Sequence, residues 1–376
     1  MLTRRAFLTY SAIGSLGSAL ALASGGLSGC LPTEDIFTGT NTIVDSIGRT
    51  VELPAPRKLK SIYFTSPLAQ IFCFTLAPDL LAGTAMQFDE SDFACLPEGT
   101  ENLKYLGSLS NGGSIDLESL AYHEVQAIFS ISGVDLTDVN VSDVLALEEK
   151  TGIPGVLIDG SFDKIGDSYR LLGNCLGRQE RAESLASYCE SVYEHVTSAI
   201  RSIPESDRVS YYFAEGPEGL QTEPNSSQHS RAFTVAGGVN VAADVPYAPS
   251  SLGMVNVKFE QVEQWDPDFI ITWDFHARTG AASLIRSSSN WARIAAVKND
   301  RVFEMPAIPF AFCDRPPGVN RFLGIQWLAN LFYPDYFDID MVDALREFYA
   351  RCYWRDVSVE QARSILGTSY TGKGGL

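Results

Sequence analysis

The 376-residue sequence is poor in histidine and in basic residues. It contains four histidines, and its 28 lysines and arginines stand against 46 acidic residues, which gives a formal net charge of −18. This deficit of basic residues excludes autonomous binding to nucleic acid, because such binding depends on neutralising phosphates. With 45% hydrophobic and 20% charged residues, the composition also excludes a disordered or fibrous chain. The sequence is that of an acidic globular protein, long enough for two domains.

The short motifs of common catalytic sites are missing. The sequence has no G-x-S-x-G elbow, no Walker sequence and no G-x-G-x-x-G, and His123-Glu124 lacks the second histidine of the H-E-x-x-H zinc motif. A Ser–His–Asp triad built on His229 and its neighbouring serines stays open, although a histidine among loop serines is more often a polar turn. These absences favour a binding protein over an enzyme.

The cysteines do not form a recognisable metal or redox motif. None of the seven belongs to a Cys-x-x-Cys pair, which disfavours zinc-finger, iron–sulfur and thioredoxin-like sites. Beyond Cys30, most of them lie in apolar runs, where a cysteine is typically a small buried hydrophobe. Their even number leaves disulfides open in an oxidising compartment. These six are Cys73, Cys95, Cys175, Cys189, Cys313 and Cys352.

Residues 1–30 are predicted to be a targeting segment. Thr3-Arg4-Arg5-Ala6-Phe7-Leu8 places a twin arginine before an uncharged stretch that ends in Leu27-Ser28-Gly29-Cys30. A membrane-spanning helix is the alternative, but glycine and serine dilute the apolar run. The pattern is typical of a twin-arginine lipoprotein signal. We therefore expect cleavage before Cys30, a lipid on this cysteine, and an extracytoplasmic protein anchored to the cell membrane. Cleavage removes two arginines and no acid, so the net charge becomes −20.

The rest of the chain alternates short apolar runs with helical patterns. Residues 31–41 are expected to be a tether, and residues 42–45 and 50–53 a β-hairpin. Strands separated by helices favour parallel βαβ units. The predicted strands are 61–64, 80–84, 127–131 and 155–159, then 209–214, 269–273 and 301–304, with late helices near 318–332 and 339–352.

A long amphipathic helix is predicted between two similar series of elements. Apolar residues recur at three- and four-residue spacing over 179–203, which predicts a rod about 40 Å long. On either side of it, Ser114–Leu120 and Asn256–Val262 each begin with a capping residue and a short helix and precede a buried strand. This repeat favours two equivalent lobes, an N-terminal lobe at 42–178 and a C-terminal lobe at 204–376.

Loops rich in glycine and serine follow the predicted strands. In open α/β sheets, ligands bind outside the carboxyl ends of the strands. Two lobes that face each other would bring these loops into one cleft. The loops are 65–67, 107–113, 132–133, 159–161, 215–219 and 273–274.

An ordered set of motifs covers roughly residues 42–355. They are Asp45–Pro54, Gly216–Thr222, Ala236–Ala242, Trp265–Ile271, Trp291–Val302 and Asp314–Ala329. This set resembles the substrate-binding lipoproteins of ABC importers for ferric siderophores, haem and cobalamin, the class III binding proteins. The resemblance implies an α/β fold of two Rossmann-like lobes with parallel sheets, joined by one long helix, with the ligand between the lobes. It also implies recognition without turnover, no intrinsic cofactor, and delivery of the ligand to an ABC permease and its ATPase.

The candidate ligand-binding residues come from both lobes. Aromatic rings could stack on a chelate or macrocycle, Arg315 could pair with a ligand carboxylate, and His229 or Glu215 could reach an open metal position. Arg315 could equally brace the turn before the helix at 318, and Phe310 could equally be core. The candidates are Ser66, Ser108 and Asn111 in the first lobe, and Tyr212, Glu215, Thr222, His229, Trp273, Phe310 and Arg315 in the second.

Permease docking in such proteins resembles a two-point contact through surface acids of both lobes. Glu90 or Glu98 could serve in the first lobe. In the second, Arg231 stands where many relatives carry an acid, so that contact stays unassigned.

The leading hypothesis is a monomeric receptor for an iron chelate. The same role for molybdate or tungstate, a nickel complex, haem or cobalamin is the alternative, although the acidic balance disfavours an anion. From a different class, an envelope enzyme exported in its folded state stays open.

Overall fold

The computed structural model describes residues 34–35, 39–133, 136, 138–246, 254–274 and 280–367. The predicted targeting segment with Cys30, and most of the predicted tether, lie outside these ranges. Within them, the structure contains no helix with the length and apolar character needed to cross a membrane.

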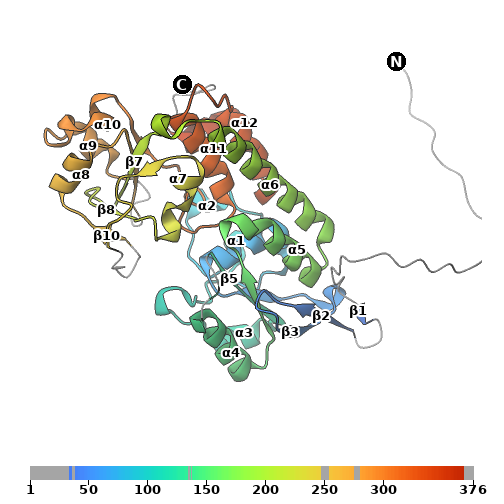
Figure 1. Ribbon diagram of the computed structural model, residues 1–376. Coiled ribbons are helices and arrows are strands. Elements are labelled where there is room, and N and C mark those ends of the chain that lie inside the picture. Colours follow the sequence, from blue (N-terminus) through green and yellow to red (C-terminus); the bar gives the residue numbers. More distant parts are fainter. Residues whose placement is uncertain are drawn as a thin grey trace, which may run out of the picture. The chain divides into compact units, whose positions relative to one another are not determined.

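The first lobe is a three-stranded parallel sheet with an antiparallel hairpin beside it (Figure 1). The predicted hairpin is confirmed as β2 and β3, and Glu34–Asp35 (β1) pairs with the start of β2. The predicted strand at 80–84 is wrong. Only single bridges form there, from Leu81 to Ile62 and from Thr84 to Tyr105, because a 3-10 turn over Pro78–Leu80 replaces its beginning. The strands are β2 (Thr40–Val44), β3 (Thr50–Pro54), β4 (Ile62–Phe64), β5 (Ala127–Ser132) and β6 (Gly155–Asp159). The helices are α1 (Pro67–Leu76), α2 (Glu90–Phe93), α3 (Leu117–Tyr122), α4 (Asp138–Thr151) and α5 (Ile165–Leu176).

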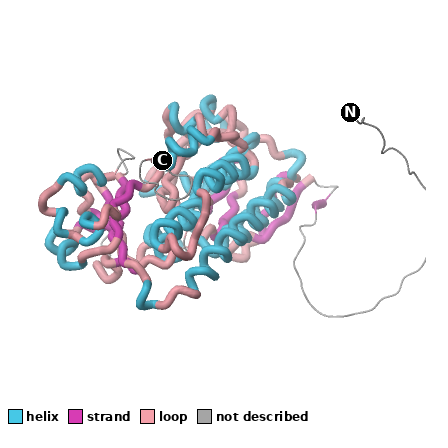
Figure 2. Tube along the Cα trace, turned by 90° about the horizontal axis from the view of Figure 1, so that it is seen from above, coloured by secondary structure: helices cyan, strands magenta, loops and turns pink. Residues whose placement is uncertain are grey.

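The second lobe is built on a mixed sheet. Its centre, β7, β11 and β12, is parallel as predicted, while β8 and β10 extend one edge in the antiparallel direction. The strands are β7 (Ser210–Glu215), β8 (Gln221–Thr222), β9 (Val239–Asn240), β10 (Val255–Asn256), β11 (Phe269–Trp273) and β12 (Val302–Glu304). The helices are α7 (Arg231–Val235), α8 (Phe259–Trp265), α9 (Ala282–Ser287), α10 (Ala295–Lys298), α11 (Asn320–Phe332), α12 (Met341–Tyr353) and α13 (Val359–Leu366). Figure 2 shows the strands of the two sheets as separate groups.

The two lobes are joined by α6 (Gln179–Arg201), which ends two residues before the predicted bound. The predicted internal repeat is also present, but both helices begin later than expected. Asp116, not Ser114, caps α3 by accepting from the N–H groups of Glu118 and Ser119. In the second lobe, Asn256 belongs to β10, and α8 starts after Lys258.

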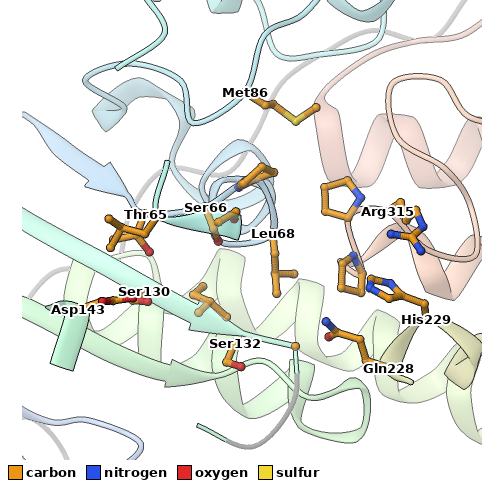
Figure 3. A pocket seen from close by; sticks show the side chains of 17 residues that line it. Thr65, Ser66, Leu68, Met86, Ser130, Ser132, Asp143, Gln228, His229 and Arg315 are labelled. Atoms are coloured by element: carbon orange, nitrogen blue, oxygen red, sulfur yellow. The ribbon is translucent and has the colours of Figure 1, made fainter. Parts of the chain in front are cut away.

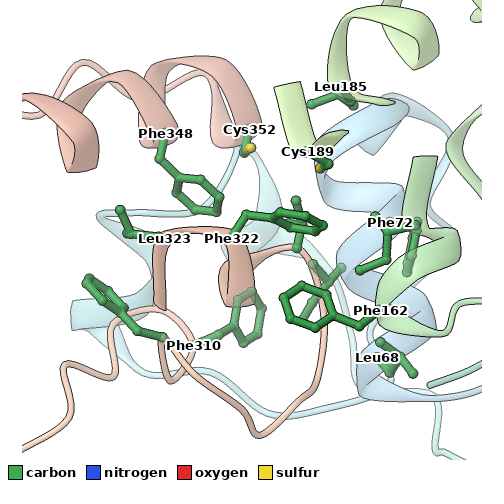
Figure 4. Close-up of a cluster of buried hydrophobic side chains, with 14 of the residues drawn as sticks. Leu68, Phe72, Phe162, Leu185, Cys189, Phe310, Phe322, Leu323, Phe348 and Cys352 are labelled. Atoms are coloured by element: carbon green, nitrogen blue, oxygen red, sulfur yellow. The ribbon is translucent and has the colours of Figure 1, made fainter. Parts of the chain in front are cut away.

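One hydrophobic core extends through both lobes (Figure 4). Leu185 and Cys189 of α6 pack into the same buried cluster as Phe322 of α11 and Phe348 of α12. From the first lobe, Phe162 joins this cluster, and its ring lies 5.0 Å from that of Phe322. Separating the lobes would expose these side chains to water, so the core holds the lobes together.

The six cysteines beyond Cys30 are buried and free of disulfide bonds. Their interpretation as small core residues is therefore confirmed. Burial raises the pKa of each thiol, for example to about 12 for Cys175 and Cys352, which makes them poor nucleophiles.

Arg181 of α6 ties α1 to α12 by hydrogen bonds. Its Nε and Nη2 donate to the carbonyl oxygen of Thr75 at 3.0 and 2.9 Å, and Nη2 also donates to the carbonyl oxygen of Arg351. The guanidinium carbon lies 4.3 Å from the centre of the Trp354 ring. A single side chain thus satisfies carbonyl groups of two helices that lie far apart in the sequence.

We expect Arg181→Met to lower the free energy of unfolding by about 2–4 kcal/mol, because it removes charge-assisted bonds to half-buried carbonyls. Urea denaturation measures the change. Arg178→Met is the matched control, since Arg178 pairs with Asp79 at the exposed surface, and such pairs contribute less than about 1 kcal/mol. Equal losses in the two variants would contradict the bridging role of Arg181.

Candidate functional site

A pocket of about 420 Å³ opens between the two lobes (Figure 3). On one side it is bounded by the residues that follow β4 and by the end of β5, as expected for the carboxyl ends of parallel strands. On the other side it is bounded by two segments of the second lobe, which carry His229 and Arg315. The lining residues are Thr65, Ser66, Pro67, Leu68, Met86, Leu109, Ser110, Ser130, Ile131, Ser132, Gly133, Asp143, Gln228, His229, Arg315, Pro316 and Pro317.

The N-terminus of α1 forms part of the first-lobe wall. Ser66 caps this helix, and its Oγ accepts from the N–H of Ala69 at 3.1 Å. Pro67 has no N–H to offer, and Gln70 donates its N–H to the carbonyl oxygen of Ser66. In the described structure, Leu68 is therefore the remaining backbone donor of the first turn. The hydroxyl hydrogen of Ser66 also stays available, because its oxygen acts as an acceptor in the cap.

Gly133 and Gln228 bring the two lobes into close approach beside the pocket. A Cβ on Gly133 would lie 2.6 Å from Oε1 of Gln228 and 3.3 Å from side-chain atoms of Leu68 and Pro317. A side chain at position 133 would therefore displace the amide of Gln228. The Oε1 atom of Gln228 is buried and accepts no hydrogen bond from the described residues, so it can accept one from a ligand.

His229 lies at the pocket with one ring nitrogen held in place. Its backbone N–H donates to Oγ of Ser227 at 3.2 Å, and its Nδ1 contacts the carboxylate of Asp314. Burial disfavours the charge on Asp314, but the neighbouring His229 and Arg315 outweigh this effect and lower the pKa of the Asp314 carboxyl group. Because Nδ1 is engaged by Asp314, Nε2 is the nitrogen left for a ligand.

Arg315 is bound by acids of its own lobe. Its Nε donates to Glu215 at 2.8 Å and its Nη2 donates to Glu223. Its guanidinium carbon lies 5.4 Å from the centre of the Trp273 ring. The side chain is 8% exposed, whereas both glutamates are fully buried. Arg315 therefore braces its own lobe by joining two buried glutamates. Its positive charge is met by these two carboxylates before any ligand arrives.

The cluster contains more carboxylates than cations. Burial raises the pKa of Glu215 to about 8, with Arg315 opposing this shift and Glu223 adding to it. Burial also raises the pKa of Glu223. One oxygen each of Glu215, Glu223 and Asp314 is buried and has no hydrogen-bond partner among the described residues. With three carboxylates around one guanidinium, the cluster is expected to retain a proton well above the usual pKa of a glutamate.

The structure brings three predicted site residues, Ser66, His229 and Arg315, to the pocket. Glu215 lies behind Arg315. Ser108 supports the wall, because its Oγ donates to the carbonyl oxygen of Thr65 and accepts from the N–H of Ser110. Asn111 lies in the adjoining 3-10 turn, Ser110–Gly112, and its side chain lies outside the described part of the structure.

Four other candidates are placed away from the pocket lining. Tyr212 is buried in the second-lobe core, where its hydroxyl donates to the carbonyl oxygen of Gly219. Phe310 packs with Phe74 and Phe88, and so belongs to the core, as its alternative interpretation held. Thr222 and Trp273 are also buried. Alternate residues of a strand face opposite sides of the sheet, so the end of a strand does not by itself indicate the pocket.

The predicted docking acids lie at the surface of the first lobe. Glu90 is the first residue of α2, and Glu98 accepts from Nη1 of Arg355 at 3.4 Å. Both are exposed.

The pocket also contains residues that were not among the predicted site residues, and only some of them had a signal in the sequence. Ser132 and Gly133 lie in a predicted loop, and Gln228 directly precedes His229. Met86 and Asp143, by contrast, come from segments that have no loop motif or resemblance to mark them. They reach the pocket only through the packing of distant segments.

We expect stability to fall as the pH rises from about 4.5 to about 8, in part because Glu215 binds a proton more tightly in the folded state than in the unfolded state. Glu215→Gln should make this fall shallower, by up to about 1.4 kcal/mol per pH unit. Urea denaturation at pH 5, 6, 7 and 8 measures the slope. Glu218→Gln, at an exposed neighbouring position, should keep the wild-type slope. If Glu215→Gln also kept it, Glu215 would not be the group that titrates.

Comparisons with known proteins agree with this architecture. The family model of the periplasmic binding proteins matches residues 97–309. The molybdate-binding protein MolA of Haemophilus influenzae is 25% identical over 270 residues, which cover 67% of this chain and 73% of that protein. An ABC transporter solute binding protein from Sulfurospirillum deleyianum is similar in structure, with a TM-score of 0.77 and 26% identity over 86% of this chain and 98% of the other. A periplasmic solute binding protein from Veillonella parvula shares the fold, with a TM-score of 0.70 and 23% identity over 87% and 97% of the two chains. The two-lobed fold, the pocket between the lobes and the matching family model together show that the chain belongs to the periplasmic binding protein family.

Proposed function

We propose that this protein is an extracytoplasmic receptor that binds an iron chelate of the siderophore type and delivers it to an ABC permease. In this proposal a lipid on Cys30 holds it at the cell membrane, and the exposed Glu90 or Glu98 contacts the permease. The observation that carries the proposal is His229, whose Nδ1 is held by the buried Asp314 at the wall of a 420 Å³ pocket.

A histidine held in this way is suited to bind a metal. Metal-binding histidines commonly use one ring nitrogen for the metal while a carboxylate orients the other. Here Asp314 is the carboxylate, and Nε2 of His229 is the free nitrogen. One imidazole supplies one ligand, so the metal would bring its other ligands with it. A chelate with an open coordination position meets this requirement.

The size and lining of the pocket favour a chelate over a bare ion. Four oxygens of a tetrahedral oxyanion occupy on the order of 120 Å³, counting each as a water molecule, which is well below 420 Å³. Apolar side chains, including Leu68, Met86 and Leu109, line part of the wall. They could contact the organic part of a chelator, as apolar walls do in small-molecule sites.

Molybdate is the second candidate, and the similarity to MolA favours it. The hydroxyl of Ser66 and the N–H of Leu68 could both donate to an oxyanion at the N-terminus of α1. However, the charge of Arg315 is already met by Glu215 and Glu223. This pairing weakens the case for a free anion as ligand.

A thermal-shift screen separates these ligands. Ferric catecholate and hydroxamate chelates, nickel–histidine, haem, cobalamin, molybdate and tungstate would each be added at increasing concentration. A ligand at one hundred times its Kd stabilises the folded state by about 2.7 kcal/mol. We expect the melting temperature to rise with a ferric chelate and not with molybdate. If the melting temperature rose with molybdate alone, the proposed ligand would be the oxyanion and not the chelate. If no ligand raised the melting temperature and the protein hydrolysed a generic ester or glycoside, the receptor role would be overturned.

His229→Gln tests the metal contact directly. We expect the affinity for the chelate to fall at least roughly tenfold, because a coordination bond is lost, and the visible absorption of the bound chelate to return to that of the free complex. His195→Gln is the control, since His195 is exposed on α6 outside the pocket. Unchanged affinity and absorption in His229→Gln would show that the imidazole does not bind the metal.

A further inference from the structure

A basic surface lies at the end of the first lobe that is remote from the pocket. Arg57, Lys58 and Lys60 line a hollow of about 670 Å³ together with His123, and Glu124 is the carboxylate in its lining. The side chains of all three basic residues are exposed. In a chain whose net charge is −18, this concentration of positive charge is a local exception. We call Arg57, Lys58, Lys60 and His123, together with Tyr122, the basic platform.

Hydrogen bonds from Gln126 and Ser61 hold the backbone of the basic platform in place. The Nε2 of Gln126 donates to the carbonyl oxygen of Lys58 at 3.0 Å, and its Oε1 accepts from the N–H of Lys60 at 2.7 Å. The hydroxyl of Ser61 donates to the carbonyl oxygen of His123 at 2.7 Å. Because these bonds use backbone atoms of the lysines, the two ammonium groups are left for an external partner. Neither ammonium group forms an ion pair with the described residues.

An aromatic ring stands beside the positive charges. Tyr122 is 82% exposed, the highest value among the exposed large hydrophobic residues of the described structure. Its ring meets the ring of His123 edge to face at 5.1 Å. Tyrosines with an exposed ring next to basic residues are typical of surfaces that contact lipid headgroups.

The chain enters the folded body next to this surface. A Cβ on Gly39 would lie 2.0 Å from Nζ of Lys58, and the carbonyl oxygen of Gly39 accepts from the N–H of Ala55 at 2.9 Å. Gly39 is nine residues beyond Cys30. A body held at a membrane through its N-terminal segment would therefore present this surface close to the bilayer.

We propose that the basic platform binds the anionic headgroups of the membrane surface and orients the protein on it. Lys60 and Gln126 precede β4 and β5, whereas the pocket lies beyond the carboxyl ends of these strands. Contact through the platform therefore turns the pocket away from the bilayer, toward the solution from which the solute arrives, and the platform must leave the membrane before the pocket meets the permease. The acidic remainder of the protein is repelled by the same surface, which reinforces this orientation. The inference rests on the proposed location at the membrane and is independent of the ligand.

Hydrogen exchange on the full-length chain tests the proposal. The chain is mixed with vesicles of phosphatidylcholine, or of phosphatidylcholine with about three tenths phosphatidylglycerol, a fraction chosen to give an anionic surface. We expect slower exchange in residues 56–61 and 121–126 with the anionic vesicles only, and loss of this protection at high salt. Equal exchange with both kinds of vesicle would overturn the proposal, whatever the ligand screen shows.

Charge variants test whether the basic platform itself causes the protection. Each basic residue near an anionic membrane strengthens binding roughly fivefold, so Lys58→Gln with Lys60→Gln should weaken binding to the anionic vesicles roughly 25-fold and reduce the protection. Lys258→Gln with Lys298→Gln changes the charge equally on the exposed surface of the second lobe and should leave the protection unchanged. Tyr122→Ala should reduce it further. Equal protection in the two lysine double variants, or the same protection from inorganic phosphate without vesicles, would overturn binding to the membrane surface.

Discussion

The buried core shared by α1, α6, α11 and α12 is the constraint on which the rest of the structure depends. It runs from the first lobe through the connecting helix into the last helices of the second lobe. Phe162 of the first lobe meets both Phe322 and the guanidinium of Arg321, which lies 4.5 Å from the centre of its ring. Because opening the lobes would expose this core, the pocket between them is largely formed before a ligand binds.

The charged cluster behind the pocket is the second constraint. Arg315 has a positive φ of 59°, a conformation that costs energy in a residue with a side chain. Its bonds to Glu215 and Glu223 hold it there. The same arrangement positions Asp314 against Nδ1 of His229. The pocket wall thus carries an oriented imidazole rather than an open cationic charge, which is why the proposed function favours a metal chelate over a bare oxyanion.

Much of the fold could be predicted from the sequence, because it depends on local patterns. The apolar repeat over 179–203 required one long helix, and buried strands at 127–131 and 269–273 followed from short apolar runs. The prediction failed at 80–84, where the run is apolar enough for a strand but pairs with its neighbours only at single bridges. The prediction also placed the caps of α3 and α8 two residues too early. Ser114 and Asn256 are favourable capping residues, but both lie before the helices begin.

The sequence by itself determined the acidic character, the two α/β lobes, the helix between them and the residue types available for binding, since these depend on composition and periodicity. Only the tertiary structure decided which candidates meet at the pocket. It placed His229 and Ser66 there, turned Arg315 toward buried carboxylates, and left Tyr212 and Phe310 in the core. The reason is physical. Whether a side chain at the end of a strand faces a ligand or the interior depends on which distant segment packs against it, and no local pattern encodes that contact.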